Sequence, residues 1–156
     1  MFWIIWGNFG FSYGPIDRAE AMNWRSHGIK SILLLTSRKE NAKKYNCLKL
    51  FRFKLRVEEV PYSTAFNVEM LKVICTWIHD NIDNFRPVVV VCEEDPTIVS
   101  SFLAAYLLFR GASLAAVLTF FHRKRSRKLF PIPIVLPTRD QIDILREFEE
   151  EIFWSE

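Results

Sequence analysis

Apolar runs typical of buried strands alternate along this chain with apolar spacings typical of helices. Residues 29–35 and 88–91 contain unbroken apolar stretches, as expected of strands covered on both faces of a sheet. The apolar residues 1–6 also predict a strand, because they are too few for an export signal and no charged segment precedes them. Helical spacing or capping residues predict helices over residues 17–27, 65–79, 96–110, 113–128 and 138–152.

The remaining segments are shorter or less regular. Residues 50–57 alternate apolar and basic positions, which predicts a strand with one face in water. We expect loops at residues 7–15, which hold three glycines, and at residues 58–63 around Pro61. Residues 38–45 are polar and expected to be exposed, and residues 130–137, with three prolines, are expected to form an extended surface connector.

Strands that alternate with helices predict an α/β fold with a central, mostly parallel sheet. The length of 156 residues suits a single domain, 1–156, with one core. In parallel sheets, ligands bind at the carboxyl ends of the strands, where helix N-termini point. Cys92 ends the valine-rich strand and is therefore expected at that edge.

Composition narrows the function classes. Half of the residues are hydrophobic and the net charge is only +3, so neither disorder nor a strongly basic nucleic-acid-binding surface is indicated. The cysteines, Cys47, Cys75 and Cys92, form no CxxC pair, which favours a reducing cytoplasm over a disulfide framework, and we expect no metal or cofactor. The longest apolar stretch, residues 102–121, is interrupted by Arg110 and Gly111, so no membrane span is expected.

A strand that ends in a cysteine, followed by a short turn and a helix, is the arrangement that cysteine-based phosphatases use to bind a thiolate and a phosphate. Residues 88–92, 100–108 and 110–117 resemble the loop strand and the two following helices of dual-specificity phosphatases. Residues 1–3 with 21–33, and residues 137–149, resemble segments of small archaeal protein tyrosine phosphatases. The resemblance implies a three-layer fold with helices on both faces of the sheet.

The catalytic signature of that family is degenerate here. The family places His before the nucleophilic Cys, Gly three residues after it, Arg six residues after it, and then Ser or Thr. Those places hold Val91, Asp95, Ile98 and Val99, so that only Cys92 remains. Isoleucine offers no donor in place of the arginine fork that grips phosphate oxygens, and loss of one preorganised donor costs roughly 3 to 4 kcal/mol of transition-state stabilisation.

The turn itself is acidic. The degenerate phosphate loop reads Glu93, Glu94, Asp95, Pro96, Thr97, Ile98 and Val99. A unit charge about 5 Å from a like charge costs about 3 kcal/mol at an effective dielectric of about 20, so these carboxylates oppose a bound anion. Asp at an N-cap followed by Pro is also a common helix start, and it predicts that the Asp95 carboxylate occupies amides that a phosphate would need.

Three interpretations of Cys92 stay open at this level. It is a small, inert, buried residue, or it has thiol chemistry such as sulfur transfer or redox sensing, or it is a phosphatase nucleophile in an unusual loop. A general acid would come from the loop before the central helix, and the family's Asp aligns with Val57, Glu58 or Glu59. Glutamates on such a loop are also common solvated residues.

A basic run ends the helix predicted before the proline-rich connector. It contains His122 and the cations Arg123, Lys124, Arg125, Arg127 and Lys128. Cations at a helix C-terminus are often only solvated, and they could also bind an anionic partner such as RNA, a phosphopeptide or an acidic protein surface. No RNA-binding motif accompanies the run, which weakens the nucleic-acid interpretation.

The sequence therefore predicts a catalytically inactive, phosphatase-like domain that acts as a binding or regulatory module, with a protein or phosphoprotein as partner. The alternative is an active cysteine-dependent protein phosphatase whose atypical loop recruits an arginine from elsewhere, for which Arg123, Arg125 and Arg127 are the clustered candidates.

Overall fold

The structure is a computed structural model that describes residues 2–6, 8–13, 18–37, 55–92, 94–126 and 134–155. Its strands form one sheet in the order β1-β2-β5-β3-β4. The first pair, β1 and β2, is antiparallel, whereas β2, β5, β3 and β4 run parallel to one another. The strands are β1 (Phe2–Trp6), β2 (Phe9–Tyr13), β3 (Ser31–Thr36), β4 (Arg56–Pro61) and β5 (Val88–Cys92). The predicted α/β fold with a mostly parallel sheet is confirmed.

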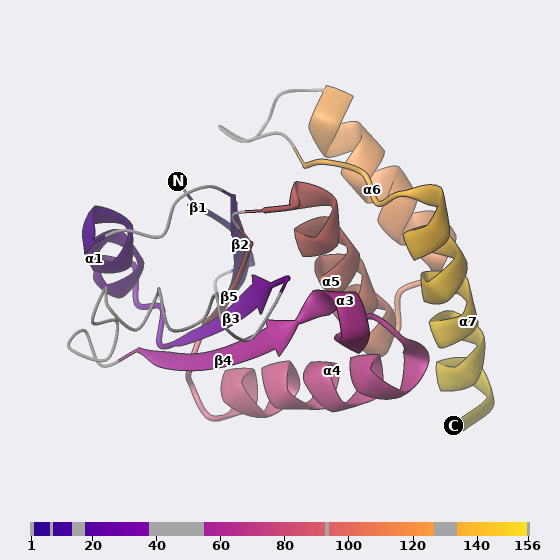
Figure 1. Cartoon of the computed structure of the whole chain (residues 1–156), viewed down its shortest axis with the longest axis horizontal. Helices are drawn as coiled ribbons and strands as arrows, with labels where there is room; N and C mark the ends of the chain where they lie inside the picture. Colours follow the sequence, from indigo (N-terminus) through magenta and orange to yellow (C-terminus); the bar gives the residue numbers. More distant parts are fainter. Residues whose placement is uncertain are drawn as a thin grey trace.

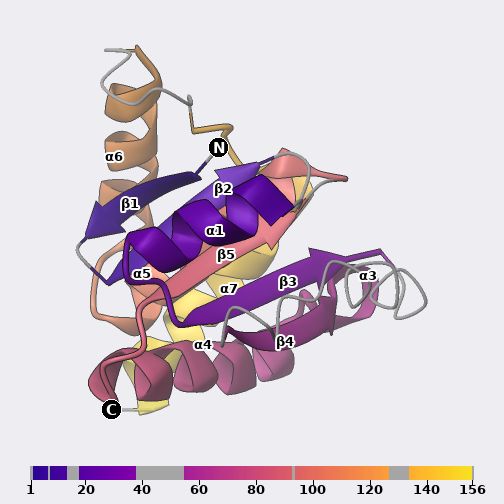
Figure 2. The ribbon, with the colours of Figure 1, turned by 90° about the vertical axis from the view of Figure 1, so that its left-hand side faces the viewer.

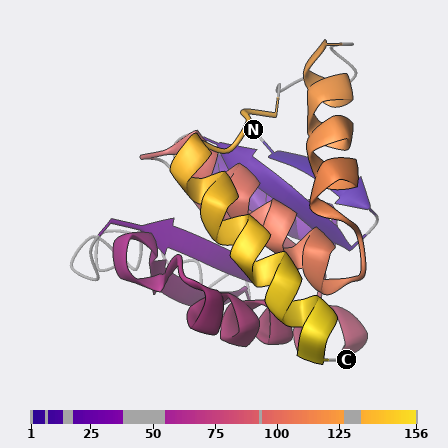
Figure 3. The ribbon, with the colours of Figure 1, turned by 90° about the vertical axis from the view of Figure 1, so that its right-hand side faces the viewer.

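Helices cover both faces of the sheet, as the resemblance implied. Figures 1 and 2 show α1 on one face, and α4 and α5 on the other. In Figure 3, α7 lies across α5 on the side away from the sheet, and it also contacts α4 and α6. The helices in the described ranges are α1 (Arg18–Ser26), α3 (Tyr62–Ala65), α4 (Val68–Asp83), α5 (Pro96–Phe109), α6 (Leu114–Ser126) and α7 (Arg139–Ser155). Among the residues described, no helix is long and apolar enough to span a membrane.

Side chains alternate across β5 and thereby divide the core in two. Val88, Val90 and Cys92 face the larger core beneath α4, α5 and α7, whereas Val89 and Val91 face the smaller core beneath α1. Helix α5 is apolar around most of its circumference because it lies between the sheet and α7. Gly28 and Gly111 have positive φ angles of 83° and 104° and end α1 and α5, as predicted.

The loop predicted for residues 7–15 is wrong, because β2 occupies most of it. Phe9 and Phe11 point into the larger core and are fully buried, and Ser12 on the opposite side donates to the Glu20 carboxylate of α1. The backbone pairs with β5 residue for residue. Burial of alternate aromatic rings against a parallel neighbour thus outweighs the low strand propensity of glycine.

The strand predicted for residues 50–57 and the loop predicted for residues 58–63 also need correction. Strand β4 runs from Arg56 to Pro61 in register with β3, and α3 follows it directly. Val57 and Val60 pack on opposite faces of the sheet. Their burial sets the position of the strand, which therefore extends past the alternating apolar and basic residues 50–57. Pro61 is tolerated because it ends the outermost strand. Residues 38–54, which include the polar 38–45 segment, lie outside the described residues.

The end of the predicted surface connector is not at the surface. Ile134 is fully buried in the larger core and Pro137 is buried beside the start of α7. The capping box that begins α7 is confirmed, since Gln141 N donates to Thr138 Oγ1 at 3.3 Å and Thr138 N donates to Gln141 Oε1 at 2.9 Å.

Candidate functional site

Cys92 is the last residue of β5, at the carboxyl edge of the sheet. It pairs with Tyr13 of β2, and α5 begins four residues later at Pro96. Its side chain turns into the larger core and is only 1% exposed. The backbone nitrogen of Asp95 donates to Cys92 Sγ at 3.4 Å. The sequence-based position of the cysteine, at a strand end before a helix N-terminus, is therefore correct.

The surroundings of Cys92 hold the pKa of its thiol above the ordinary value of 9.0. Burial is the main cause, and the carboxylates of Glu94 and Asp95 add to it, whereas backbone N–H groups of Asp95 and Glu94 act in the opposite direction. At neutral pH the group is a thiol. Because a thiolate is the nucleophilic form, this arrangement does not activate Cys92.

Asp95 is the N-cap of α5, as predicted, with Pro96 in the first turn. Its Oδ1 accepts a hydrogen bond from the backbone nitrogen of Thr97 at 3.0 Å and another from Thr97 Oγ1 at 2.6 Å. A carboxylate at this position complements the helix dipole. One of the amide donors at the start of α5 is therefore already used within the chain.

Gln141 of α7 closes the same end of α5 from the other side. Its Nε2 donates to Thr97 Oγ1 at 3.0 Å, and its Oε1 accepts from Ser101 Oγ at 2.7 Å. The same oxygen accepts the Thr138 N–H of the capping box. Asp95, Thr97 and Gln141 thus form one hydrogen-bonded chain that ties the turn after Cys92 to α7.

Glu94 joins the turn to the ends of β3 and β4. Its carboxylate accepts from the backbone nitrogen of Ser37 at 3.2 Å and from the Tyr62 hydroxyl at 3.4 Å. Burial, followed by the neighbouring Glu94 charge, raises the pKa of Tyr62 to about 12. Glu93 lies outside the described residues.

Ile98 and Val99 occupy the places at which the phosphatase signature has Arg and Ser or Thr. Both side chains belong to the larger core, with Ile98 4% exposed and Val99 fully buried. No guanidinium or hydroxyl is supplied to the turn at these positions. The described residues also include no cluster of three or more His, Cys, Asp or Glu side chains that could hold a metal ion.

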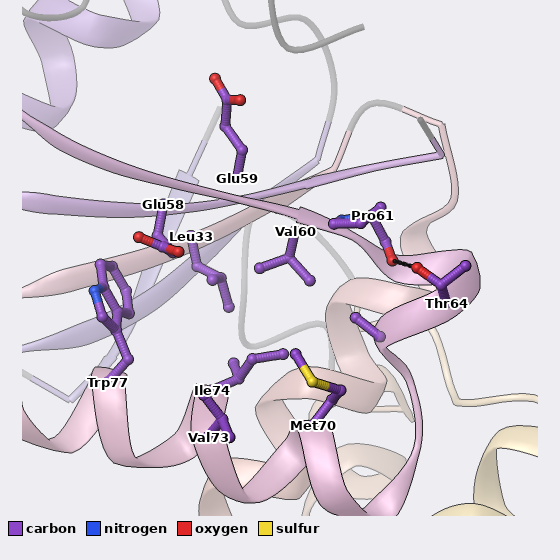
Figure 4. Close-up of a pocket in the computed structure, with 11 residues that line it drawn as sticks. Leu33, Glu58, Glu59, Val60, Pro61, Thr64, Met70, Val73, Ile74 and Trp77 are labelled. Atoms are coloured by element: carbon purple, nitrogen blue, oxygen red, sulfur yellow. Dashed lines mark hydrogen bonds between the residues drawn. The ribbon is translucent and has the colours of Figure 1, made fainter. Parts of the chain in front are cut away.

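The two general-acid candidates lie on a strand and not on a loop. Glu59 pairs with Leu34, which in turn pairs with Val91, so Glu59 is two strands away from β5. Two steps across a sheet amount to about 10 Å. Glu58 and Glu59 point to opposite sides of β4, as Figure 4 shows. The structure therefore does not bring either carboxylate next to Cys92.

The basic run lies on the far part of α6. Arg123 is exposed and lines a shallow cavity with Leu118, Leu136 and Ile142. Lys124 and Arg125 belong to the last turn of α6, and Arg127 and Lys128 lie outside the described residues. None of the residues that line this cavity belongs to the turn that follows Cys92.

Sequence reasoning missed Tyr62 and Ser101 as neighbours of the turn, and it treated Gln141 only as a capping residue. The capping-box signal was visible because Thr138 and Gln141 are three residues apart. The contact between Gln141 and Thr97 spans 44 residues of sequence, and local patterns do not reveal it.

Comparison with protein-family models and with curated proteins finds no match. Among solved structures, Tk-PTP in its active form is 24% identical, with a TM-score of 0.76 over 96% of each chain. PTPMT1 is 12% identical, with a TM-score of 0.78 over 99% of this chain and 98% of its own. Human tyrosine phosphatase-like serine/threonine/tyrosine-interacting protein is 14% identical, with a TM-score of 0.74 over 97% of each chain. The chain has the fold of the cysteine-based phosphatases.

Proposed function

We propose that this protein is a catalytically inactive phosphatase-like domain that works as a binding or regulatory module. The observation that carries the proposal is the turn after Cys92, where a buried isoleucine, Ile98, stands at the position of the phosphate-gripping arginine. An aliphatic side chain provides no donor for a phosphate oxygen or for the charge that develops in the transition state.

The electrostatics of the turn support the same conclusion. Asp95 occupies the Thr97 amide with its own carboxylate, and the Glu94 carboxylate lies within hydrogen-bonding distance of Ser37 and Tyr62 at the same edge of the sheet. A phosphate dianion at this turn would meet acidic side chains, at about 3 kcal/mol of repulsion for each pair of unit charges about 5 Å apart. The raised pKa of Cys92 disfavours the thiolate as well.

The alternative of an active phosphatase that recruits an arginine has less support. Among the clustered candidates, Arg123 is the one whose side chain is described, and it lies beside Leu118, Leu136 and Ile142. An arginine recruited from there would have to replace both the missing guanidinium and the donor that Asp95 has already occupied.

Turnover of para-nitrophenyl phosphate tests the proposal. We expect the purified protein and its Cys92→Ser variant to give the same background rate, while Tk-PTP in its active form serves as the positive control. A rate that is clear in the native protein and lost in Cys92→Ser would overturn the proposal. Vanadate offers a second readout, because a bound oxyanion at the Cys92 turn in a crystal soaked with vanadate would also contradict it.

A further inference from the structure

A groove separate from the Cys92 turn runs between β4 and α4 (Figure 4). It encloses a cavity of about 380 Å³. This volume is near the lower end of small-ligand pockets, so the groove suits a few side chains and not a large cofactor. The lining residues are Leu33, Glu58, Glu59, Val60, Pro61, Thr64, Ala65, Met70, Val73, Ile74 and Trp77.

Helix α4 presents more apolar surface than its packing in the core requires. Leu71, Cys75 and Ile78 are buried against the sheet and α5, as in an ordinary amphipathic helix. A second apolar stripe, made of Met70, Val73 and Trp77, follows the groove. Met70 is 39% and Val73 is 60% exposed, although both are large hydrophobic side chains. One wall of the groove is therefore apolar and open to solvent.

The charge on the groove is negative and comes from Glu58. Figure 4 shows the Glu58 side chain on the groove side of β4, beside Trp77, whereas Glu59 points to the opposite side of the strand. Within the described part of the chain, no hydrogen bond or ion pair holds the Glu58 carboxylate, and no basic side chain lines the groove. An exposed carboxylate therefore lies next to an apolar wall and an indole ring.

We propose that this groove binds a segment of a partner protein that carries apolar side chains next to a lysine or arginine. The cation would pair with Glu58, and its alkyl stem would lie on the Trp77 ring, since Lys and Arg combine an apolar stem with a charged end and are attracted to aromatic faces. The neighbouring apolar side chains would cover Met70 and Val73. An acidic segment would place a like charge beside Glu58 and is therefore disfavoured. This inference rests on the binding role proposed above and supplies the chemistry of the partner.

Fluorescence anisotropy with two labelled peptide pools tests it on the full chain. In one pool a fixed arginine either precedes or follows two fixed leucines. In the other pool glutamate replaces that arginine. We expect the arginine pool to bind and the glutamate pool to bind at least about tenfold more weakly. Glu58→Gln is expected to weaken binding of the arginine pool about threefold to tenfold. Val73→Ser is expected to weaken binding of both pools.

Matched controls separate the groove from the rest of the surface. Glu147→Gln removes another exposed carboxylate on α7, and Met22→Ser removes another exposed apolar side chain on α1, so neither is expected to change binding. Glu58→Lys is expected to reverse the preference between the two pools. Equal binding of both pools, no binding at about 1 mM protein, or an equal effect of the control variants would overturn the proposal.

One further outcome would assign the groove to a different occupant. If sedimentation shows a dimer that Val73→Ser dissociates, the occupant is a second copy of the chain and the proposal is overturned. Failure of the peptides to bind would not affect the conclusion from para-nitrophenyl phosphate turnover, because the groove contains no residue of the Cys92 turn. The peptide experiment and the turnover experiment can therefore fail independently.

Discussion

Asp95 Oδ1 accepts hydrogen bonds from both the backbone nitrogen and the hydroxyl of Thr97, at 3.0 and 2.6 Å. The helix N-terminus that could bind an anion instead binds an acid of its own chain. This contact serves stability, because an N-cap satisfies a backbone donor that is otherwise left without a partner at a helix start.

Replacement of Asp95 by alanine is therefore expected to lower the free energy of unfolding by about 1 to 2 kcal/mol, as measured by urea denaturation. Asp95→Asn keeps an acceptor at the same place and is expected to cost less than about 0.5 kcal/mol. If asparagine and alanine destabilise the protein equally, the side-chain cap is not what stabilises the start of α5.

The bond from Gln141 Nε2 to Thr97 Oγ1 predicts energetic coupling between α7 and the turn. In a double-mutant cycle with Thr97→Val and Gln141→Ala, we expect a coupling free energy of about 0.5 to 1.5 kcal/mol from urea denaturation. Thr76→Val on the exposed side of α4 is the control, and its effect should add to that of Gln141→Ala within about 0.5 kcal/mol. Additive effects of Thr97→Val and Gln141→Ala would contradict the coupling.

The parts of the fold that the sequence predicted are those with a strong local pattern. The valine run 88–91 is typical of a buried strand, and Asp95-Pro96 and Thr138 with Gln141 are local helix-start signals that need no distant contact. Strand β2 was missed because Gly10 within it and Gly7 and Gly14 beside it suggest a loop, and because its burial depends on pairing with β5, about eighty residues later in the sequence.

In the candidate site, too, the local features could be predicted from the sequence and the features that depend on distant contacts could not. The absence of the arginine could be read directly from the sequence, where Ile98 stands at its position. The Asp95 cap could also be read from the sequence, because Pro96 follows Asp95. The position of Glu58 and Glu59 could not, because the register of β4 on β3 decides which carboxylate faces α4 and how far each lies from Cys92. The apolar groove beside α4 was also hidden, since Met70, Val73 and Trp77 look in sequence like ordinary core positions of a helix.

Restoring the missing arginine alone is expected to fail. Ile98 is 4% exposed and its side chain lies in the larger core, so Ile98→Arg should lower the free energy of unfolding by about 3 kcal/mol or more. We also expect no turnover of para-nitrophenyl phosphate, because Asp95 still occupies the Thr97 amide. Ile98→Leu is the control for packing and should cost less than about 1.5 kcal/mol. An Ile98→Arg variant that is stable and active would show that the turn is only one residue away from a working phosphate site.

The raised pKa of Cys92 predicts how stability depends on alkaline pH. Below the ordinary thiol pKa of 9.0, the folded and unfolded states both keep the proton, and the stability that burial of the neutral thiol provides is fully present. As the pH rises above that value the unfolded thiol ionises first, so stability is lost until the pH passes the folded-state pKa. The free energy of unfolding should therefore fall more steeply between about pH 9 and pH 10.5 in the native protein than in Cys92→Ala, by at most about 1.4 kcal/mol per pH unit.

Urea denaturation at several pH values measures this difference. Tyr13, Tyr106 and Cys75 also have raised pKa values, but they are present in both proteins and Cys92 is not among the causes of their shifts, so their contributions cancel in the comparison. The Cys92 charge helps to raise the pKa of Tyr62, so the part of the Tyr62 contribution that depends on Cys92 is included in the measured difference. Cys75→Ala, which removes a buried thiol of α4 whose pKa is raised by burial, provides a second reference for the effect of burial alone. Equal slopes for the native protein and Cys92→Ala would mean that the Cys92 thiol ionises as readily in the folded chain as in the unfolded one, and the thiolate would then be available for chemistry at the turn.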